Sequence, residues 1–503
     1  MNNITLVEAM NFFEYIEKNT KIPSYEIEGW KVWPIFRVNL SFNLTVKNNE
    51  NIKQDRIKTL LKKPKAVLYY GYSCIRLLEL LYGKNNNCDV VVRTSSDLRR
   101  DFLDKKYKDV IFDDLIQNMP NTRFFIMEDL GYNFKRFKPF TRIDIFSEGW
   151  RILYRLRKLE INPDEIEKIK KDIINELLEI KKKGKFIAEI EKTIKYMENR
   201  FSTRIVDFFK IKSFFLDIFK KTNPKIFLTT CTYGYEGMNA AAKELKIPIV
   251  DVLHGMMHKY HHGYIFGKHL KKYEKQFPVA DYIFTQNKPS TDIFLKHTFW
   301  DRKKVKTIGN LRVDYWGKRI ENNHKIFRNV FFGLEGEDSE IIELAEKTME
   351  ILKNKNIDVK FSLKMHPGER LFLENLEKLK QRFPENIQII DAEALNLYEY
   401  ISKSDVNVTI GSTIHFEAIS LHKPTIMAGI KEWRYLGDLV KEGSAKLAKT
   451  PEELAELIIH VLNRDKFYLA WMKKVVNNSK KYQEKDSINK GVYELNQILN
   501  IVQ

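Results

Sequence analysis

Residues Lys225–Gly255 read KIFLTTCTYGYEGMNAAAKELKIPIVDVLHG. Two short runs within this stretch, KIFLTT and PIVDVL, are apolar and of strand length, which is typical of buried strands. The segment between them, YEGMNAAAKELKI, has helical spacing and ends before Pro248. A strand, a helix and a second strand in this order predict a right-handed crossover between parallel strands.

The same alternation continues on both sides of a boundary that we place near Asn322. DYIFTQN and KTIGN extend the first series, and a second series begins near Asn329 with NVFFGLEG, DVKFSLKMHPGE, NIQIID, VNVTIGS and PTIMAG, separated by helical segments. Two such series predict an α/β protein of two doubly wound, Rossmann-like domains that face a cleft. The expected domains are an N-terminal one over 1–322, a C-terminal one over 323–465, and closing helices over 466–503 that cross back to the first.

The N-terminal half adds further strands and a helical insertion to this plan. KAVLYY, DVVVRTSS and RFFIME are predicted strands. Over about 150–221, dense mixed charge at helical spacing predicts long, solvent-facing helices. The last of them, FKIKSFFLDIFKK (Phe209–Lys221), mixes aromatic residues with lysines. It would either lie on an anionic membrane or pack on the N-terminal domain with a wet basic edge.

Composition and charge limit the function classes. Of 503 residues, 43% are hydrophobic and 30% are charged, which is typical of globular domains. Three widely spaced cysteines exclude a disulfide framework and a four-cysteine zinc site, and no apolar run is long enough to span a membrane. The acidic N-terminus is unlike a signal peptide, so we expect a cytoplasmic protein. The net charge of +19 favours an anionic surface or substrate, whereas no nucleic-acid-binding motif is present.

The segment LKMHPGE (Leu363–Glu369) is the first candidate site. Lys364 and His366 stand where a predicted strand ends, and two residues apart on an extended chain they can face one ligand. A helix is expected after Pro367, and its free N–H groups favour an anion. The structural alternative is a hydrogen-bonded histidine at a strand end, followed by a turn proline.

The segment TIGSTIHFEAISLHKPTIM (Thr409–Met427) is the second candidate site. Gly411 allows close approach of the backbone after a strand, and Ser412 is the expected N-cap of the next helix. Thr413 and Glu417 lie four residues apart, so they could offer a hydroxyl to phosphates and a carboxylate to ribose. One face would pack on the sheet through Ile414, Ala418 and Leu421. The alternative is an ordinary capped helix of an α/β domain.

Together, KMHPGE and IGSTIHFEAISLHKPTIM resemble the nucleotide-binding half of GT-B glycosyltransferases that build bacterial surface polysaccharides. The groups concerned are capsule-synthesis enzymes, sialyl- and Kdo-transferases, and teichoic-acid polymerases, which carry a Lys-x-His-Pro motif and a later Ser/Thr motif. The segment ending in VDVLHG, with ADYIFTQN and KTIGNLRVDYW, is similar to the helix–strand–HG arrangement of the same enzymes. The resemblance covers about residues 225–462. It implies that the donor phosphates are held by Lys364, His366, Ser412 and Thr413, and that His254 faces the acceptor.

Four histidines lie in VDVLHGMMHKYHHGY (Val250–Tyr264) and leave three alternatives open. His254 directly follows a predicted strand, so it would face the cleft and could take a proton from an attacking hydroxyl. The following residues would line an acceptor groove or form a partly exposed loop: Tyr260, His261, His262 and Tyr264. The spacing of His254, His258 and His262 would also suit zinc on a helix. Because two glycines interrupt the stretch and no carboxylate or cysteine ligand stands in it after Asp251, we expect no metal.

These observations predict a metal-independent glycosyltransferase that needs no cofactor. It would move a sugar from a nucleotide-activated donor, with CMP- or UDP-sugars favoured, to a surface-polysaccharide or lipid-linked glycan. The predicted catalytic residues are His254, as the base, and His366, with Gly411 and Glu417 completing the donor site. The protein would work at the inner face of the plasma membrane as a peripheral protein. The alternatives are a non-hydrolysing UDP-sugar 2-epimerase and an inactive GT-B scaffold. The acidic pair Asp113–Asp114 is expected at the surface.

Overall fold

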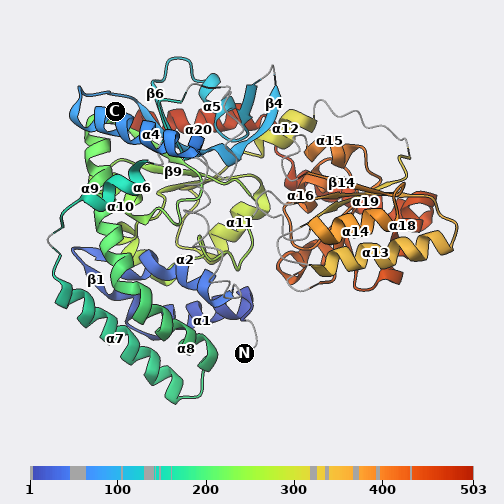
Figure 1. The fold of residues 1–503 in the computed structure, drawn as a ribbon, viewed down its shortest axis with the longest axis horizontal. Coiled ribbons are helices and arrows are strands. Elements are labelled where there is room, and N and C mark those ends of the chain that lie inside the picture. The colour runs from blue at the N-terminus through green and yellow to red at the C-terminus, as the bar shows by residue number, and fades with distance from the viewer. Residues whose placement is uncertain are drawn as a thin grey trace.

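The computed structural model describes residues 4–45, 64–103, 106–129, 141, 143–146, 149–159, 161–255, 257–317, 326–334, 339–365, 373–391, 397–430 and 433–501. In these ranges the chain forms two lobes, and each lobe is built around its own parallel sheet (Figure 1). The predicted α/β class, with two Rossmann-like domains in a GT-B arrangement and a helical insertion in the N-terminal half, is confirmed.

The N-terminal sheet has the strand order β11-β10-β9-β8-β3-β6-β7, and every neighbouring pair is parallel. Its strands are nearly continuous runs of buried residues, as expected when helices cover both faces. The strands are β3 (Val90–Ser95), β6 (Phe124–Asp129), β7 (Ile145–Phe146), β8 (Ile226–Thr229), β9 (Ile249–Val252), β10 (Tyr282–Thr285) and β11 (Val305–Thr307).

Alternate residues of these strands enter two separate hydrophobic cores. Val91, Phe227 and Ile249 face a core that contains side chains of four helices: α4 (Pro64–Tyr82), α9 (Ser202–Thr222), α10 (Glu236–Glu244) and α11 (Lys288–His297). Val92 and Leu228 point the other way, toward α5 (Asp113–Gln117), α12 (Leu311–Gly317) and α20 (Ser487–Ile501). Packing on both faces fixes the register of the strands, because a slip by one residue would move the side chains of each face to the other face.

The helical insertion packs beside this sheet with the first residues of the chain. A third core joins α7 (Pro163–Lys182), α8 (Ile187–Tyr196) and the start of α9 to α1 (Leu6–Asn19) and α2 (Val32–Thr45). α7 buries one stripe and leaves its charged face in solvent, as predicted. α9 differs, because its phenylalanines are buried in the protein, among them Phe214, Phe215 and Phe219. Of the two interpretations of Phe209–Lys221, the packed helix is correct.

The C-terminal sheet has the order β14-β13-β12-β15-β16-β17 and is also entirely parallel. Its strands are β12 (Asn329–Gly333), β13 (Lys360–Lys364), β14 (Ile387–Ile390), β15 (Val406–Thr409), β16 (Thr425–Ala428) and β17 (Ala445–Ala448). Its helices are α13 (Ser339–Asn354), α14 (Leu373–Arg382), α15 (Leu397–Ser402), α16 (Ile414–Ser420), α17 (Asp438–Lys441), α18 (Pro451–Asn463) and α19 (Lys466–Tyr482). β17 was not predicted.

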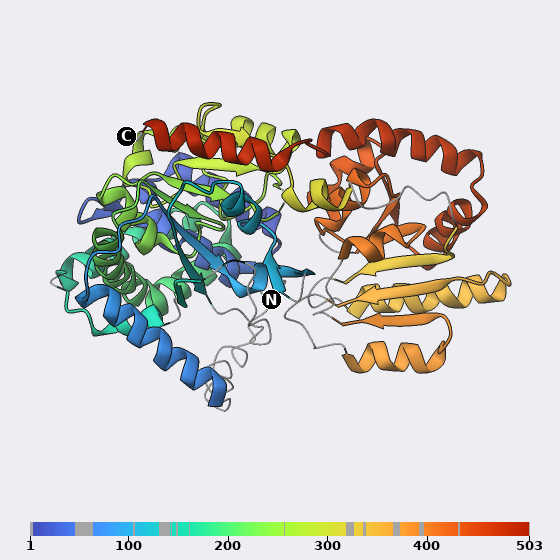
Figure 2. The same ribbon diagram turned by 90° about the horizontal axis from the view of Figure 1, so that it is seen from above.

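The last two helices divide between the lobes. α19 lies along the C-terminal lobe, and α20 crosses to the N-terminal lobe (Figure 2). Leu495 and Ile498 of α20 enter the N-terminal core, and the backbone N–H of Ser487 donates to Asp314 at 3.2 Å. The predicted boundary near Asn322 lies outside the described residues.

One predicted strand is wrong. KAVLYY belongs to α4, which continues to Tyr82 and buries Ser73, Leu77 and Leu80 at helical spacing. A short apolar run fits a strand or a helix equally well, and here the following residues extend the helical pattern. Smaller elements are the hairpins β1 (Glu26–Ile27) with β2 (Trp30–Lys31) and β4 (Arg99–Leu103) with β5 (Lys106–Asp109), and α6 (Trp150–Leu153). None of the described helices is both long and apolar enough to cross a membrane.

Candidate functional site

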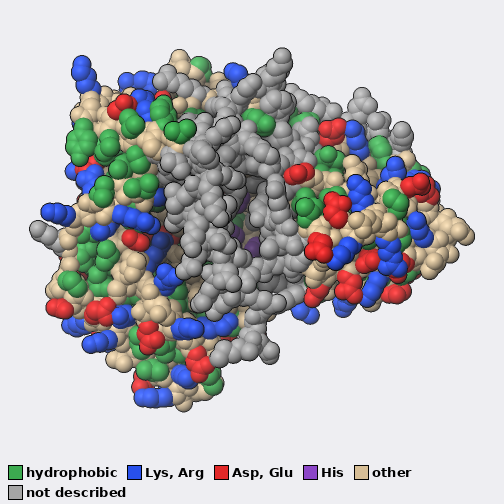
Figure 3. Space-filling view, viewed as in Figure 1, with side chains coloured by type: hydrophobic (Ala, Val, Ile, Leu, Met, Phe, Trp, Pro, Cys, Tyr) green, Lys and Arg blue, Asp and Glu red, His purple; other side chains and the backbone are tan. Residues whose placement is uncertain are grey.

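The candidate site begins where β8 and β9 end side by side. These parallel neighbours pair Thr229 with Asp251, so the loops that follow them leave the same edge of the sheet. Cys231 follows β8 after one residue, and His254 follows β9 in the same way. The His254 side chain is exposed, and Figure 3 shows histidine side chains at the bottom of a hollow between the lobes. Ligands of open α/β sheets bind at this edge.

Cys231 and His254 contact each other across this edge. The Sγ atom of Cys231 lies 3.0 Å from Nδ1 of His254 and 3.9 Å from Nε2. Burial raises the pKa of the Cys231 thiol to about 11, so the sulfur keeps its proton at neutral pH. The pair is therefore a neutral thiol beside an accessible imidazole, rather than a thiolate nucleophile with its base.

Asp251 fixes the loop that carries Cys231. Its fully buried carboxylate accepts hydrogen bonds from the Thr232 backbone N–H at 2.9 Å, the Thr232 hydroxyl at 2.8 Å and the Tyr264 hydroxyl at 2.8 Å. Burial raises the pKa of Asp251, and these donors oppose that rise. The carboxylate thus ties the β8 loop to the end of the histidine stretch.

Arg93 holds the same loop from its other side. Its guanidinium donates to Asp129 at 2.5 Å and to the Thr230 carbonyl at 3.3 Å, and its Cζ lies 3.2 Å from the centre of the Tyr235 ring. Asp129 ends β6 and Arg93 lies in β3, so the ends of three strands are tied together. Buried pairs with this many hydrogen bonds specify one arrangement of the groups that they join.

The residues predicted to bind the nucleotide-sugar donor lie in the C-terminal lobe. Lys364 ends β13 and is nearly buried, and its Nζ reaches the Met365 carbonyl at 3.5 Å. His366 and Pro367 lie outside the described residues. Gly411 and Ser412 follow β15 at the same carboxyl edge, because β13, β12 and β15 are parallel neighbours.

The predicted cap of α16 differs from the structure. Thr413, not Ser412, occupies the N-cap position, and its side chain makes no capping hydrogen bond. The Ser412 hydroxyl accepts only a long bond of 3.4 Å from the Ile414 N–H. The helix begins at Ile414, one residue later than a cap at Ser412 would place it, although the backbone is already helical at Thr413. The apolar face packs as predicted, through Ile414, Ala418 and Leu421.

Two contacts bring the lobes together at this place. A Cβ atom on Gly255 would lie 3.6 Å from Cγ2 of Thr413, so the loop after His254 lies against the start of α16. The His258 ring stacks on Tyr435, with centroids 5.5 Å apart and an interplanar angle of 13°. Tyr435 lies in the 3₁₀ turn Trp433–Leu436 that follows β16. The loop that follows His254 and the start of α16 at Thr413 are therefore neighbours across the two lobes.

Glu417, which is predicted to bind ribose, is hydrogen-bonded to an aromatic residue of the protein. Its Oε1 accepts a hydrogen bond of 2.9 Å from the Tyr398 hydroxyl. The Tyr398 ring in turn contacts α12, with the Arg312 guanidinium 4.7 Å from its centre and Trp316 stacked at 6.4 Å. Part of the hydrogen-bonding capacity of Glu417 is thus already used inside the protein.

The remaining histidines form a half-buried aromatic cluster beside the site. His261 and His262 lie 5.4 Å and 6.0 Å from the Tyr233 ring, and Tyr260 packs partly against the insertion core. Burial lowers the pKa of His258 and His262 to about 4, so both are neutral at physiological pH. Within the described ranges, no three His, Cys, Asp or Glu side chains are placed to hold a metal ion.

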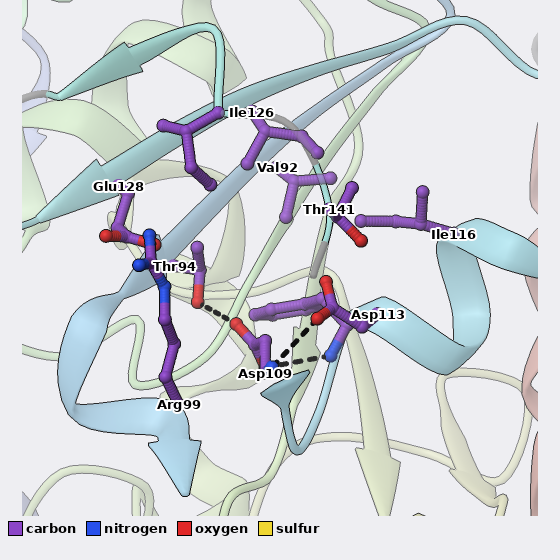
Figure 4. Close-up of a pocket in the computed structure, with 11 residues that line it drawn as sticks. Val92, Thr94, Arg99, Asp109, Asp113, Ile116, Ile126, Glu128 and Thr141 are labelled. Carbon is purple, nitrogen blue, oxygen red and sulfur yellow. Dashed lines mark hydrogen bonds and ion pairs between the residues drawn. The ribbon is translucent and has the colours of Figure 1, made fainter. Parts of the chain in front are cut away.

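A second cluster of ionisable groups lies away from this site. Figure 4 shows a pocket between β3, β6 and α5 into which three carboxyl side chains point: Asp109, Asp113 and Glu128. The hydroxyl of Thr94 donates to Asp109, and Arg99 pairs with Glu128. Burial raises the pKa of Asp113 and of Glu128 to about 7. The expectation that Asp113 lies at the surface is wrong, whereas Asp114 is half-buried and pairs with Lys108 at 2.5 Å.

Sequence reasoning missed several residues of the candidate site. Asp251 carried a usable signal, because a carboxylate inside the apolar run PIVDVL requires buried donors. Cys231 and Tyr435 carried none, since their roles depend on which strands pair and on where the two lobes meet.

No model of a known protein family and no curated protein matches the sequence. Among solved structures, UDP-GlcNAc 2-epimerase from Neisseria meningitidis bound to UDP-GlcNAc matches with a TM-score of 0.48 and 14% identity, over 81% of this chain and 100% of that one. The structure of MnaA from S. aureus with UDP matches with a TM-score of 0.49 and 13% identity, over 82% of this chain and 97% of that one. The wall teichoic acid polymerase TagF matches with a TM-score of 0.47 and 13% identity, over 90% of this chain and 98% of that one. Likeness at this level does not decide between a transferase and an epimerase.

Proposed function

We propose that this protein is a metal-independent glycosyltransferase that moves a sugar from a nucleotide-activated donor, with CMP- or UDP-sugars favoured, to a surface-polysaccharide or lipid-linked glycan. The observation that carries the proposal is the contact between Gly255 and Thr413. Gly255 directly follows the exposed His254, and Thr413 occupies the N-cap position of the helix whose hydroxyl and N–H groups we assign to the leaving phosphate. A transferase needs both at once: a base for the acceptor hydroxyl and donors for the leaving phosphate.

In the proposed reaction, His254 takes the proton of the acceptor hydroxyl as its oxygen attacks the anomeric carbon. The bond from that carbon to the phosphate oxygen breaks, and the nucleotide leaves with the bonding electrons. Lys364 and the hydroxyl and N–H groups of Ser412 and Thr413 would stabilise the negative charge that develops on the phosphate. Glu417, which accepts a hydrogen bond from Tyr398, would bind ribose. His366, outside the described residues, stays a predicted catalytic and phosphate-binding residue.

The N-terminal helices that pack on the helical insertion favour a transferase over a 2-epimerase, because α2 helps build the wall beside the histidine cluster. The Arg37 guanidinium of α2 donates to the His262 carbonyl and to the Ile265 carbonyl, the latter at 2.6 Å. Phe42 of the same helix lies 4.5 Å from the His262 ring. Such a wall of neutral imidazole and aromatic rings suits a sugar acceptor through Tyr260, His261 and His262, and an epimerase has no acceptor to bind.

The proposal is tested by incubating the protein with CMP-, UDP-, GDP- and CDP-activated sugars and measuring nucleotide release with and without glycan acceptors. Release from one donor that rises with an acceptor supports the transferase. Interconversion of a UDP-sugar without any acceptor would instead support the epimerase. Binding without turnover of any donor would favour an inactive GT-B scaffold.

The proposal includes work at an anionic membrane surface. Support comes from the net charge of +19 and from α4, which exposes apolar side chains: Leu68, Tyr72, Ile75 and Tyr82. We expect the protein to float with anionic vesicles at low salt and to be released at high salt, because screening weakens the attraction. Ile75→Asn should weaken binding, whereas Leu178→Asn, on the exposed face of α7, should not. Negligible binding at both salt concentrations would contradict this part.

A further inference from the structure

We propose that Arg37 is a positioning residue for the acceptor: its guanidinium fixes residues 258–265, the histidine loop, beside the candidate site. The inference rests on the proposed function, which assigns rings of this loop to the acceptor. Nη1 of Arg37 donates to the His262 carbonyl, and Nη2 donates to the Ile265 carbonyl at 2.6 Å. One side chain of α2 thus holds the main chain of the loop at two points.

The guanidinium is itself held in one orientation. Its Nε donates to the Glu17 carboxylate of α1 at 2.9 Å, and both side chains are buried. The Trp33 indole donates to the same carboxylate oxygen at 2.9 Å. The Arg37 Cζ lies 5.1 Å from the centre of the Phe13 ring and 4.5 Å from that of Phe266. A planar fork whose three nitrogens all have partners specifies one arrangement of the groups that it joins.

Stability alone does not account for this ion pair. Taking two charges out of water is costly, and a buried pair is often no more stable than apolar side chains of the same size. Arg37 and Glu17 lie among the aromatic side chains of the core that joins α1 to α2, where apolar replacements would pack without that cost. An apolar side chain, however, has no donors for the two carbonyl oxygens of the histidine loop.

The rings of the histidine loop form a row between α2 and the C-terminal lobe. Phe42 of α2 lies 4.5 Å from the His262 ring, which lies 5.3 Å from the His261 ring. The His261 ring lies 5.7 Å from that of His258, which stacks on Tyr435 of the other lobe. The guanidinium therefore fixes the end of the row that is farther from the C-terminal lobe. A shift of the loop main chain would move the rings assigned to the acceptor relative to the lobe that carries the predicted donor residues.

The first test needs no substrate. Arg37→Lys keeps a charge beside Glu17 but lacks the fork that bridges two carbonyls. Glu17→Gln combined with Arg37→Met removes both buried charges together, so that neither is left unpaired. In the loop, the backbone N–H groups of Tyr264 and Ile265 donate to the His261 carbonyl at 3.2 and 3.0 Å. Hydrogen exchange of these amides should become faster in both variants, on the order of tenfold.

The matched control is Glu26→Gln combined with Lys31→Met. This ion pair of 2.5 Å also includes a buried cation, but it joins β1 to β2 instead of holding the histidine loop. It should leave exchange in the loop unchanged. The internal reference is exchange in β8 and β9, which should be the same in every variant. Unchanged loop exchange in both Arg37 variants, or equal acceleration in β8 and β9, would overturn the inference.

A second readout separates the acceptor from the donor. Nucleotide release from CMP-, UDP-, GDP- and CDP-activated sugars is measured with and without glycan acceptors. In Arg37→Lys, KM for the acceptor should rise on the order of tenfold, whereas KM for the donor and any release without acceptor should stay unchanged. Equal changes in both KM values would reduce Arg37 to a residue that supports the fold. If the unmodified protein turns over no donor, the proposed function fails, and the exchange result alone decides whether Arg37 positions the loop.

Discussion

His254 and Lys364 stand in the same kind of place in two different lobes, each at the carboxyl end of a buried parallel strand. That position could be predicted from the sequence, because the apolar runs PIVDVL and DVKFSLK mark where each strand stops. The partners of His254 could not be predicted, since Cys231 becomes its neighbour only through the pairing of β8 with β9.

His254→Ala should abolish most transfer and spare folding. The side chain is exposed, so its loss leaves no cavity, and the predicted phosphate-binding groups belong to the other lobe. A positioned general base contributes about 10²–10⁴-fold to the rate, so kcat should fall by that factor. Nucleotide release, nucleotide affinity and Tm are the measurements. An unchanged kcat at equal Tm would remove His254 from the chemistry.

Lys364→Ala should weaken donor binding. A hydrogen bond to a charged phosphate contributes about 1.5–3 kcal/mol, which corresponds to roughly tenfold to a hundredfold in Kd. The matched control is Lys360→Ala, because Lys360 begins the same strand and is exposed at its opposite end. Calorimetry with the preferred nucleotide should show the loss only in Lys364→Ala. Equal affinities in the two variants would move the donor site elsewhere.

At the scale of elements, burial decided what local patterns left open. Phe209–Lys221 could lie on a membrane or in a core, and KAVLYY could be strand or helix; in both cases the tertiary partners settled the outcome. Tertiary packing likewise decides which carboxyl group beside α5 is buried. Asp113 and Asp114 are neighbours in sequence, and only Asp113 is buried. No periodicity distinguishes the two, since the difference comes from β3 and β6 behind the helix.

Asp113→Asn should change how stability depends on pH. Burial raises the pKa of Asp113 to about 7, whereas carboxyl groups of unfolded chains titrate near 4. Between these values the folded protein keeps a proton that the unfolded chain has released, so this group lowers the free energy of unfolding as pH rises. The slope is up to about 1.4 kcal/mol per pH unit.

The measurement is the difference between the unmodified protein and Asp113→Asn in urea unfolding at several pH values. A difference is needed because the depressed pKa of His258, His262 and His415 contributes the opposite slope below about pH 6.5. The variant should gain relative stability toward pH 7, while Asp114→Asn on the same helix should not follow that course. Parallel curves for Asp113→Asn and the unmodified protein would show that the carboxyl is not protonated in the fold.

At the scale of the whole molecule, the return of α20 brings the last helix of the sequence into a core of the N-terminal lobe. The doubly wound plan and, apart from α4 and β17, the order of its main strands and helices followed from hydrophobic patterns. The contacts between the lobes did not, because Thr413, Tyr435 and Tyr398 meet residues that lie far away in sequence. Pattern predicts an element, whereas the mutual orientation of two lobes depends on surfaces that only the folded chain brings together.

Leu495→Ala should destabilise the N-terminal lobe. Leu495 is 1% exposed in the core beside Leu115, and truncating such a side chain costs about 2–5 kcal/mol. Leu469→Ala, on α19 and 60% exposed, should change stability by less than about 0.5 kcal/mol. Hydrogen exchange should show faster exchange in β8 and β9 for the first variant only. Faster exchange confined to the C-terminal sheet would mean that α20 does not belong to the N-terminal core.

The crossing of α20 also sets the order in which the chain can mature on the ribosome. Domains of most multidomain proteins fold one after another as they emerge. Here the N-terminal sheet emerges first, but Leu495 and Ile498, which complete its core, are synthesised only after the entire C-terminal lobe. The lobe that is made first is therefore finished last. Until then, the apolar side chains of α5 and α12 that share this core lack the partners that α20 supplies.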